Sequence, residues 1–228
     1  MGNYLENFFN LIDKYHQNRI INFLKLFNLE SIIDVGSHKG EFLSYALKLS
    51  KIKKIYAFEP QIEINKILAE KFAKHKNIEI FNFALDKEVS KKKIYINKLS
   101  STSTLSELNR SSFYLKLKNF FINSKNNFVN SYYVNTNTID NLFKDILLRN
   151  TLLKVDVEGF EINVLMGGIN KIKTEIPFIL IEHQMGNQYK NSNARIVHKF
   201  LLENNFKVLK TFFFPTFHFK DVLYKKIK

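Results

Sequence analysis

The chain has 228 residues, of which 45% are hydrophobic, so it is long enough for one substantial core and too short for two comfortable domains. It contains no cysteine, which excludes disulfides, thiolate metal sites, iron–sulfur clusters and a cysteine nucleophile. Its 35 Lys and Arg residues outnumber its 21 Asp and Glu residues, and the resulting charge of +14 suits a polyanionic partner or an anionic membrane, but also follows from lysines scattered along the chain.

The first thirty residues predict a helical extension. Apolar residues recur at three- and four-residue intervals between Tyr4 and Phe27, which is typical of one or two amphipathic helices. We expect residues 1–30 to cover the sheet that follows; a homodimer through these helices is the alternative, and peripheral membrane contact is not expected. No apolar run approaches the ~20 residues that span a bilayer, and acidic Glu6 lies where a signal peptide carries lysine, so we expect a cytoplasmic protein.

From Ser31 onward, short β-rich apolar runs alternate with helical stretches, which predicts an α/β, Rossmann-like domain over residues 31–228. Its mostly parallel sheet would carry helices on both faces and end in a C-terminal antiparallel hairpin. The expected strands are 31–36, 54–59, 78–83, 152–157 and 178–183, and the hairpin pairs 206–213 with 221–226. The expected helices are 41–50, 61–73, one from Thr138 and 194–204. The pattern is less regular from 86 to 134, with a strand at 93–97, a polar loop at 100–104 and a short helix at 113–121.

A glycine-bearing turn follows the first strand. Gly36 and Gly40 let the backbone pass close to a ligand at a helix N-terminus, although a Gly-x-x-x-Gly turn alone is a weak signal. Glu59 closes the second strand near the ~20-residue spacing at which a carboxylate reaches ribose hydroxyls. Both NAD and S-adenosylmethionine present such a ribose. Three features favour S-adenosylmethionine: the wider glycine spacing, the terminal hairpin and Asp34. The Asp34 carboxylate can hold the turn and meet the ammonium group of the ligand.

Carboxylates gather at the predicted carboxyl ends of the later strands. Asp156 and Glu158, at i and i+2, leave their strand on the same side, and Gly159 permits a tight exit into a helix. Methyl transfer to an alcohol needs a base, and Asp156 is the first candidate, as a base or as an electrostatic orienter beside a sulfonium. Glu158 is a catalytic candidate or a helix cap. Glu182 would bind the acceptor, and His183 is a second base or a structural hydrogen-bond partner.

Two further expectations concern the acceptor and metals. Ser103 and Thr104, in the polar loop, are candidates for lining the acceptor pocket, although such a run is also typical of a solvated turn. The acidic residues with His183 could bind a divalent cation. Nothing in their spacing requires one, and we predict no metal.

Several segments together are similar to the FkbM family of S-adenosylmethionine-dependent methyltransferases. They are Asp34-Val35-Gly36 through Gly40, Phe58-Glu59-Pro60, Asn82-Phe83-Ala84-Leu85, Thr138-Ile139-Asp140, Lys154-Val155-Asp156-Val157-Glu158-Gly159-Phe160-Glu161 and Ile181-Glu182-His183. The segment from Lys154 to Glu161 is the specific one, and the others are shared more widely among methyltransferases.

The resemblance implies roles for individual residues. Gly36, Ser37 and Gly40 would wrap the methionine portion of the cofactor, Glu59 beside Pro60 would bind the ribose, Phe83 and Ala84 would approach the adenine, and Asp156 would lie beside the sulfur. The commoner family turn has Ala-Asn where this chain has Ser37-His38.

The resemblance also implies an activity, since family members modify hydroxyls on glycans and secondary metabolites. We therefore expect an O-methyltransferase whose acceptor is a sugar, a glycan or a small metabolite. An RNA or other nucleic-acid methyltransferase is the alternative that the charge suggests, but the chain lacks an Asn/Asp-Pro-Pro-aromatic tetrad after the strand at 152–157. A non-catalytic nucleotide-binding module is a third alternative.

Overall fold

The computed structural model describes residues 2–97, 128–184, 194–215 and 219–227. The polar loop predicted at 100–104, with Ser103 and Thr104, and the helix predicted at 113–121 lie outside the described residues.

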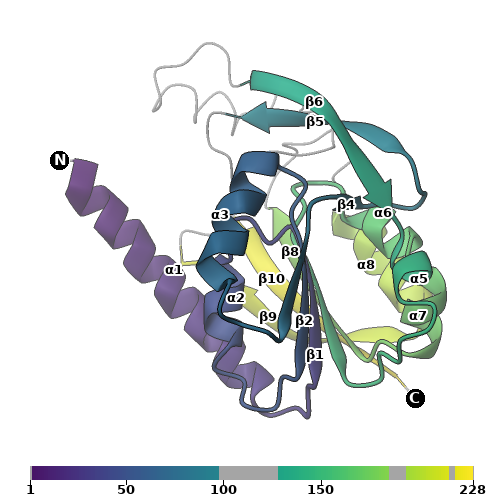
Figure 1. Ribbon diagram of the computed structural model, residues 1–228. Helices are drawn as coiled ribbons and strands as arrows, with labels where there is room; N and C mark the ends of the chain where they lie inside the picture. The colour runs from purple at the N-terminus through teal and green to yellow at the C-terminus, as the bar shows by residue number, and fades with distance from the viewer. Residues whose placement is uncertain (1, 98–127, 185–193, 216–218, 228) are drawn as a thin grey trace.

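The centre of the molecule is a seven-stranded sheet in the order β3-β2-β1-β7-β8-β10-β9 (Figure 1). All neighbouring strands are parallel except β10, which runs antiparallel to β8 and β9. This confirms the predicted mostly parallel sheet with a C-terminal antiparallel hairpin. The strand bounds are β1 Ser31–Val35, β2 Lys54–Phe58, β3 Ile78–Phe81, β7 Thr151–Val155, β8 Phe178–Gln184, β9 Phe206–Phe213 and β10 Phe219–Lys226.

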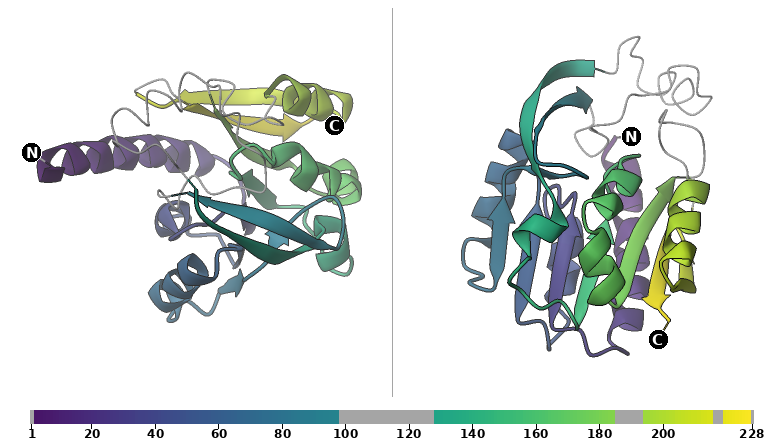
Figure 2. Two further views of the ribbon diagram at one scale, coloured as in Figure 1. Left: turned by 90° about the horizontal axis from the view of Figure 1, so that it is seen from above. Right: turned by 90° about the vertical axis from the view of Figure 1, so that its right-hand side faces the viewer.

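Helices cover both faces of this sheet, as Figure 2 shows from above. One face packs against α1 (Gly2–Leu24), α2 (Glu41–Ala46) and α3 (Ile62–Phe72), and the other against α5 (Ile139–Leu142), α6 (Glu161–Met166), α7 (Ile169–Thr174) and α8 (Ala194–Glu203). Successive strand residues therefore enter different cores: Ile32 lies in the α1–α3 core and Ile33 in the α5–α8 core. Every residue of β7 is buried, as expected for a central parallel strand.

A single helix, α1, fills most of the predicted N-terminal extension. Its carboxyl-terminal part buries Ile20, Ile21 and Leu24 against the sheet, while its amino-terminal end reaches away from the rest of the molecule (Figures 1 and 2). Within the described residues, no helix has the length and apolar character needed to cross a membrane.

A second, three-stranded sheet lies beyond the carboxyl ends of the central strands (Figure 1). Its order is β4 (Ala84–Leu85), β6 (Phe128–Asn137) and β5 (Lys91–Asn97). The sequence predicted part of β5 but neither β4 nor β6. A small core of Ala84, Ile94 and Val134 holds this sheet together, and the Tyr132 hydroxyl accepts a hydrogen bond from the Ile62 amide at the start of α3.

Candidate functional site

The turn between β1 and α2 is shaped by residues with positive φ. Gly36 has φ 82°, and a Cβ there would lie 1.9 Å from the Asp156 carbonyl oxygen, so only glycine fits where the ends of β1 and β7 meet. Gly40 has φ 73°, and its Cβ would lie 2.3 Å from the Phe72 ring. His38 also has a positive φ, 47°, which histidine tolerates better than most residues.

Glu59 connects this turn to the end of β2. Glu59 is 3% exposed, and its carboxylate accepts hydrogen bonds from the His38 amide at 3.0 Å and from the Gln61 amide at 2.8 Å. Burial raises the pKa of Glu59, and the hydrogen bonds from Gln61 and His38, together with the charge of His38, oppose the rise only in part. The Gln61 side chain also donates to this carboxylate. A carboxylate has about four lone-pair positions, so one remains for a further donor, such as a ribose hydroxyl.

The residues expected near the adenine lie beside Glu59. Asn82 donates side-chain hydrogen bonds to the carbonyl oxygens of Glu59 and Pro60, which ties the end of β3 to the end of β2. The Phe83 ring packs 5.6 Å from that of Phe58, and Ala84 is buried in β4. The adenine contacts themselves stay predictions.

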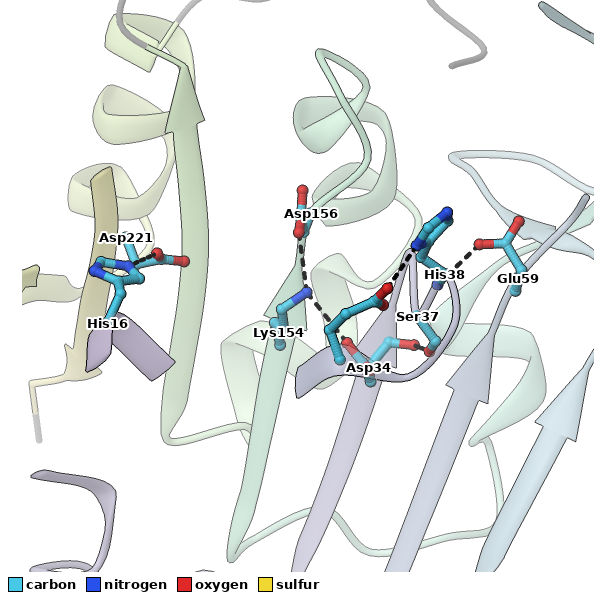
Figure 3. A network of polar contacts seen from close by, with 9 residues as sticks. His16, Asp34, Ser37, His38, Glu59, Lys154, Asp156 and Asp221 are labelled. Carbon is cyan, nitrogen blue, oxygen red and sulfur yellow. Dashed lines mark hydrogen bonds and ion pairs between the residues drawn. The ribbon is translucent and has the colours of Figure 1, made fainter. Parts of the chain in front are cut away.

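A buried lysine lies beneath the end of β7. The Lys154 ammonium is 3.4 Å from Asp34 Oδ1 and 3.2 Å from Asp156 Oδ2 (Figure 3). Asp34 has no exposed surface, so its carboxylate faces Lys154 inside the protein, and the predicted contact to a ligand's ammonium group stays untested. The Ser37 hydroxyl donates to the Asp34 carbonyl oxygen at 2.9 Å and so closes the turn.

The turn after β7 presents the next carboxylate. Glu158 has φ 53° and Gly159 has φ 94°, two consecutive positive values that reverse the chain sharply. The Glu161 carboxylate, 7% exposed, accepts a hydrogen bond from the Gly159 amide at 2.8 Å. Burial raises the pKa of Glu161 to about 7. The negative charge of Asp156 adds to this rise, whereas hydrogen bonds from backbone amides of the turn lower the pKa and offset the rise only in part. Glu161 therefore holds the loop that carries Asp156 and Glu158.

The structure brings three of the predicted carboxylates together. Oxygen atoms of Asp156, Glu158 and Glu182 all lie within 4.8 Å of one another. The register explains this, because Val155 pairs with Ile181 and the next residues of β7 and β8 then share one face. Burial, followed by the charges of Asp156, Asp221 and Glu158, raises the pKa of Glu182 well above its usual value. Such an oxygen set could also hold a hard divalent cation, and the absence of a metal stays a prediction.

A second buried pair lies next to Glu182 and was not anticipated from the sequence. Asp221 is the cross-strand neighbour of Glu182 in the β8–β10 register. His16 of α1 contacts Asp221 through Nε2 at 2.7 Å (Figure 3). The pKa of Asp221 is raised because burial outweighs the contact with His16.

His183 is not part of the carboxylate cluster. Adjacent strand residues point to opposite faces, so its imidazole lies on the α8 side of the sheet, where Tyr224 contacts both His183 Nε2 at 3.3 Å and His198 Nδ1 at 3.1 Å. Burial, with smaller effects of Lys220 and His198, lowers the pKa of His183 to about 4. This geometry favours the structural interpretation, and a catalytic role stays a prediction.

Comparisons with known proteins agree with this geometry. The family model described as "Methyltransferase FkbM domain" matches residues 34–208. A search of curated protein sequences gave no match. Among solved structures, the methyltransferase FkbM from Methylobacillus flagellatus KT is similar with a TM-score of 0.57 and 14% identity; the alignment covers 87% of this chain and 44% of that one, so this chain spans less than half of that protein's length.

Two other structures have the same fold over most of their length. A SAM-dependent methyltransferase from Aquifex aeolicus has a TM-score of 0.51 and 14% identity, with 92% of this chain and 89% of that chain covered. A putative rRNA-methylase from Clostridium thermocellum has a TM-score of 0.54 and 9% identity, with 92% and 95% covered. At these identities the likeness establishes the fold alone, and it confirms the predicted Rossmann-like methyltransferase architecture.

The residues present fit S-adenosylmethionine. A buried carboxylate with spare acceptor capacity ends β2, and negative charge for a sulfonium gathers where β7 and β8 end. The family match, the sheet order and the carboxylates at the ends of β2 and β7 together show that the chain belongs to the FkbM methyltransferase family, whose methyl donor is S-adenosylmethionine.

Proposed function

We propose that this methyltransferase acts on oxygen, and that its acceptor is a hydroxyl group of a sugar, a glycan or a small metabolite. The observation that supports this is the cluster of Asp156, Glu158 and Glu182, whose oxygens lie within 4.8 Å of one another. Carboxylates accept hydrogen bonds from hydroxyl groups, and closely spaced carboxylates suit an acceptor that carries several hydroxyls.

Asp156 and Glu182 each have a task in the proposed reaction, and Glu158 stays a catalytic candidate. When bound, S-adenosylmethionine supplies a methyl group on a positively charged sulfur. Asp156 Oδ2 faces Lys154, which leaves Oδ1 to orient the acceptor hydroxyl and to take its proton. Asp156 has a side-chain exposure of 30%, as a residue in contact with an acceptor requires. Glu182, whose raised pKa favours the protonated form, can donate a hydrogen bond to a neighbouring oxygen.

RNA is the competing acceptor. The charge of +14 favours it, and the similar protein from Clostridium thermocellum is described as a putative rRNA-methylase. The carboxylates at the ends of β7 and β8 argue against it, because they would repel a phosphate backbone close to the reacting atoms.

Methyl-labelled S-adenosylmethionine tests the proposal. The enzyme is incubated with the labelled donor and either mixed mono- and oligosaccharides or bulk RNA, and the label in each acceptor is counted. We expect the label to enter the saccharides and to remain there after treatment with mild alkali. A methyl ether withstands this treatment, whereas a methyl ester is hydrolysed. Asp156→Ala should abolish transfer, whereas Asp145→Asn, at a side chain that is 85% exposed, should leave it unchanged. Label in RNA alone, with binding that weakens steeply as salt increases, would replace the saccharide by RNA.

A further inference from the structure

Lys154 is the buried cation beneath the carboxylates of the candidate site. It is 6% exposed, and its ammonium lies between two carboxylates, Asp34 on β1 and Asp156 at the end of β7 (Figure 3). The β1–β7 register pairs Asp34 directly with Lys154, so the backbone hydrogen bonds of the sheet fix this contact. The contact to Asp156 spans i to i+2 on the same face of the strand.

The surrounding charges keep Lys154 protonated. Burial is the largest single effect and lowers the pKa of Lys154, but the nearby carboxylates outweigh it and the net pKa is raised. Those carboxylates come from four consecutive strands of the sheet: Asp34 from β1, Asp156 from just beyond β7, Glu182 from β8 and Asp221 from β10. Lys154 is thus a permanent cation among acidic groups.

The two partners of Lys154 differ in their exposure. The Asp34 side chain has none, whereas that of Asp156 is 30% exposed. The contacts therefore lead from the buried carboxylate of Asp34, through the Lys154 ammonium, to the Asp156 carboxylate at the edge of the sheet where the cofactor is expected. Only the last group of this chain can touch a ligand.

We propose that Lys154 is a positioning residue that holds Asp156 Oδ2 and thereby keeps the Asp156 carboxylate beside the sulfonium of S-adenosylmethionine, while Asp34 anchors Lys154 from the other side. The inference rests on the methyl donor and not on the acceptor. The saccharide assignment can therefore fail while this proposal stands, and the reverse also holds.

Replacing Lys154 by methionine removes the cation and keeps most of the volume. Asp34, Asp156 and Glu182 then face one another without a compensating charge, and the pKa values of Asp34 and Glu182 are already raised by burial. Without the cation, Asp34 and Glu182 bind protons more readily than in the wild type, and Asp156 loses the contact that orients it. Affinity for a cationic ligand should fall most at low pH and recover as pH rises.

Calorimetry with two probes tests this. S-adenosylmethionine carries the sulfonium charge, and S-adenosylhomocysteine is the neutral thioether of nearly the same shape. We expect Lys154→Met to weaken binding of the first by roughly ten-fold or more at pH 6, as loss of a charge-assisted contact does, with a smaller loss at pH 9 and little change for the second. Lys154→Arg keeps the charge and should follow the wild type.

A matched control separates positioning from folding. Lys171 on α7 is also buried and forms an ion pair with Glu175 at 2.7 Å, so Lys171→Met should lower the melting temperature without changing the preference between the two probes. If Lys154→Met does not fold, the double variant Asp34→Asn with Lys154→Met removes both buried charges and should show the same selective loss. Equal weakening of both probes at every pH in the folded variant would overturn the proposal and leave Lys154 a purely structural role.

Discussion

Glu161 gives the most direct test of the electrostatics of the site. Its carboxylate is 7% exposed and holds the loop after β7 through the Gly159 amide. Burial raises its pKa from 4.5 to about 7, so the folded protein binds a proton at Glu161 more tightly than the unfolded chain does. Replacement by Gln keeps an oxygen that accepts from Gly159 and removes the titration.

The sign and size of the effect follow from linkage. Because the folded pKa is raised, the stability that Glu161 contributes is fully present below about pH 4.5 and is lost as pH rises through about 7. A shift of this size corresponds to about 3 kcal/mol between these limits. The free energy of unfolding of Glu161→Gln should therefore gain about 3 kcal/mol relative to the wild type between pH 4.5 and pH 8.5.

Urea unfolding of both proteins across this pH range measures the difference directly. Glu175→Gln is the control of opposite sign: burial alone would raise the pKa of Glu175, but its bonds to Lys171 and Leu148 outweigh burial and lower it. The wild type should therefore lose the contribution of Glu175 as pH falls. Parallel stability curves for the wild type and Glu161→Gln would show that Glu161 is not desolvated, and the reasoning about this loop would fail.

Four further substitutions test the turn after β1 and the carboxylates of Glu59 and Asp156. Gly36→Ala would bring a Cβ within 1.9 Å of the Asp156 carbonyl oxygen and force a left-handed residue, so urea unfolding should show a loss of about 2–5 kcal/mol; Gly40→Ala, whose Cβ meets side chains only, should lose less. Glu59→Gln places an amide NH₂ against a backbone amide, so it should cost about 1–3 kcal/mol and weaken S-adenosylmethionine binding in calorimetry. Asp156→Asn removes negative charge, so it should weaken S-adenosylmethionine roughly ten-fold and leave S-adenosylhomocysteine unchanged; equal affinities of the variant and the wild type for both ligands would exclude contact with the sulfonium.

The position of the site could be predicted because it depends on strand ends. Val35 pairs with Phe58 on one side and with Val155 on the other, so Gly36, Glu59 and Asp156 each follow the same register level. Apolar periodicity locates such strand ends well, since a buried parallel strand is a short apolar run that stops at a polar residue.

The face of the sheet on which each site residue lies follows less directly from the sequence than the position of the strand ends does. Glu182 and His183 are consecutive on β8 and therefore point to opposite faces, so only one of them can lie in the carboxylate cluster. The pair of His16 and Asp221 depends on how α1 packs across the hairpin, and no local pattern predicts a contact between residues 205 positions apart. β6 was missed because polar residues interrupt its alternation.

The buried carboxylates near the candidate site share one electrostatic property. Burial raises the pKa of Asp34, Glu59, Glu161, Glu182 and Asp221, so each of them makes the folded protein less stable as pH rises. Among the described groups that face these carboxylates, compensating charge comes from Lys154 and from two histidines, His16 beside Asp221 and His38 beside Glu59.

A bound cation would favour the charged form of these carboxylates and return part of that stability. By the same linkage, the cluster binds a cation more tightly when it is ionised. A site that is electrostatically incomplete without a positive charge suits the sulfonium donor better than the neutral thioether that remains after methyl transfer. With the proposed contact to the sulfonium, the same carboxylates that cost stability in the free protein would favour exchange of product for donor.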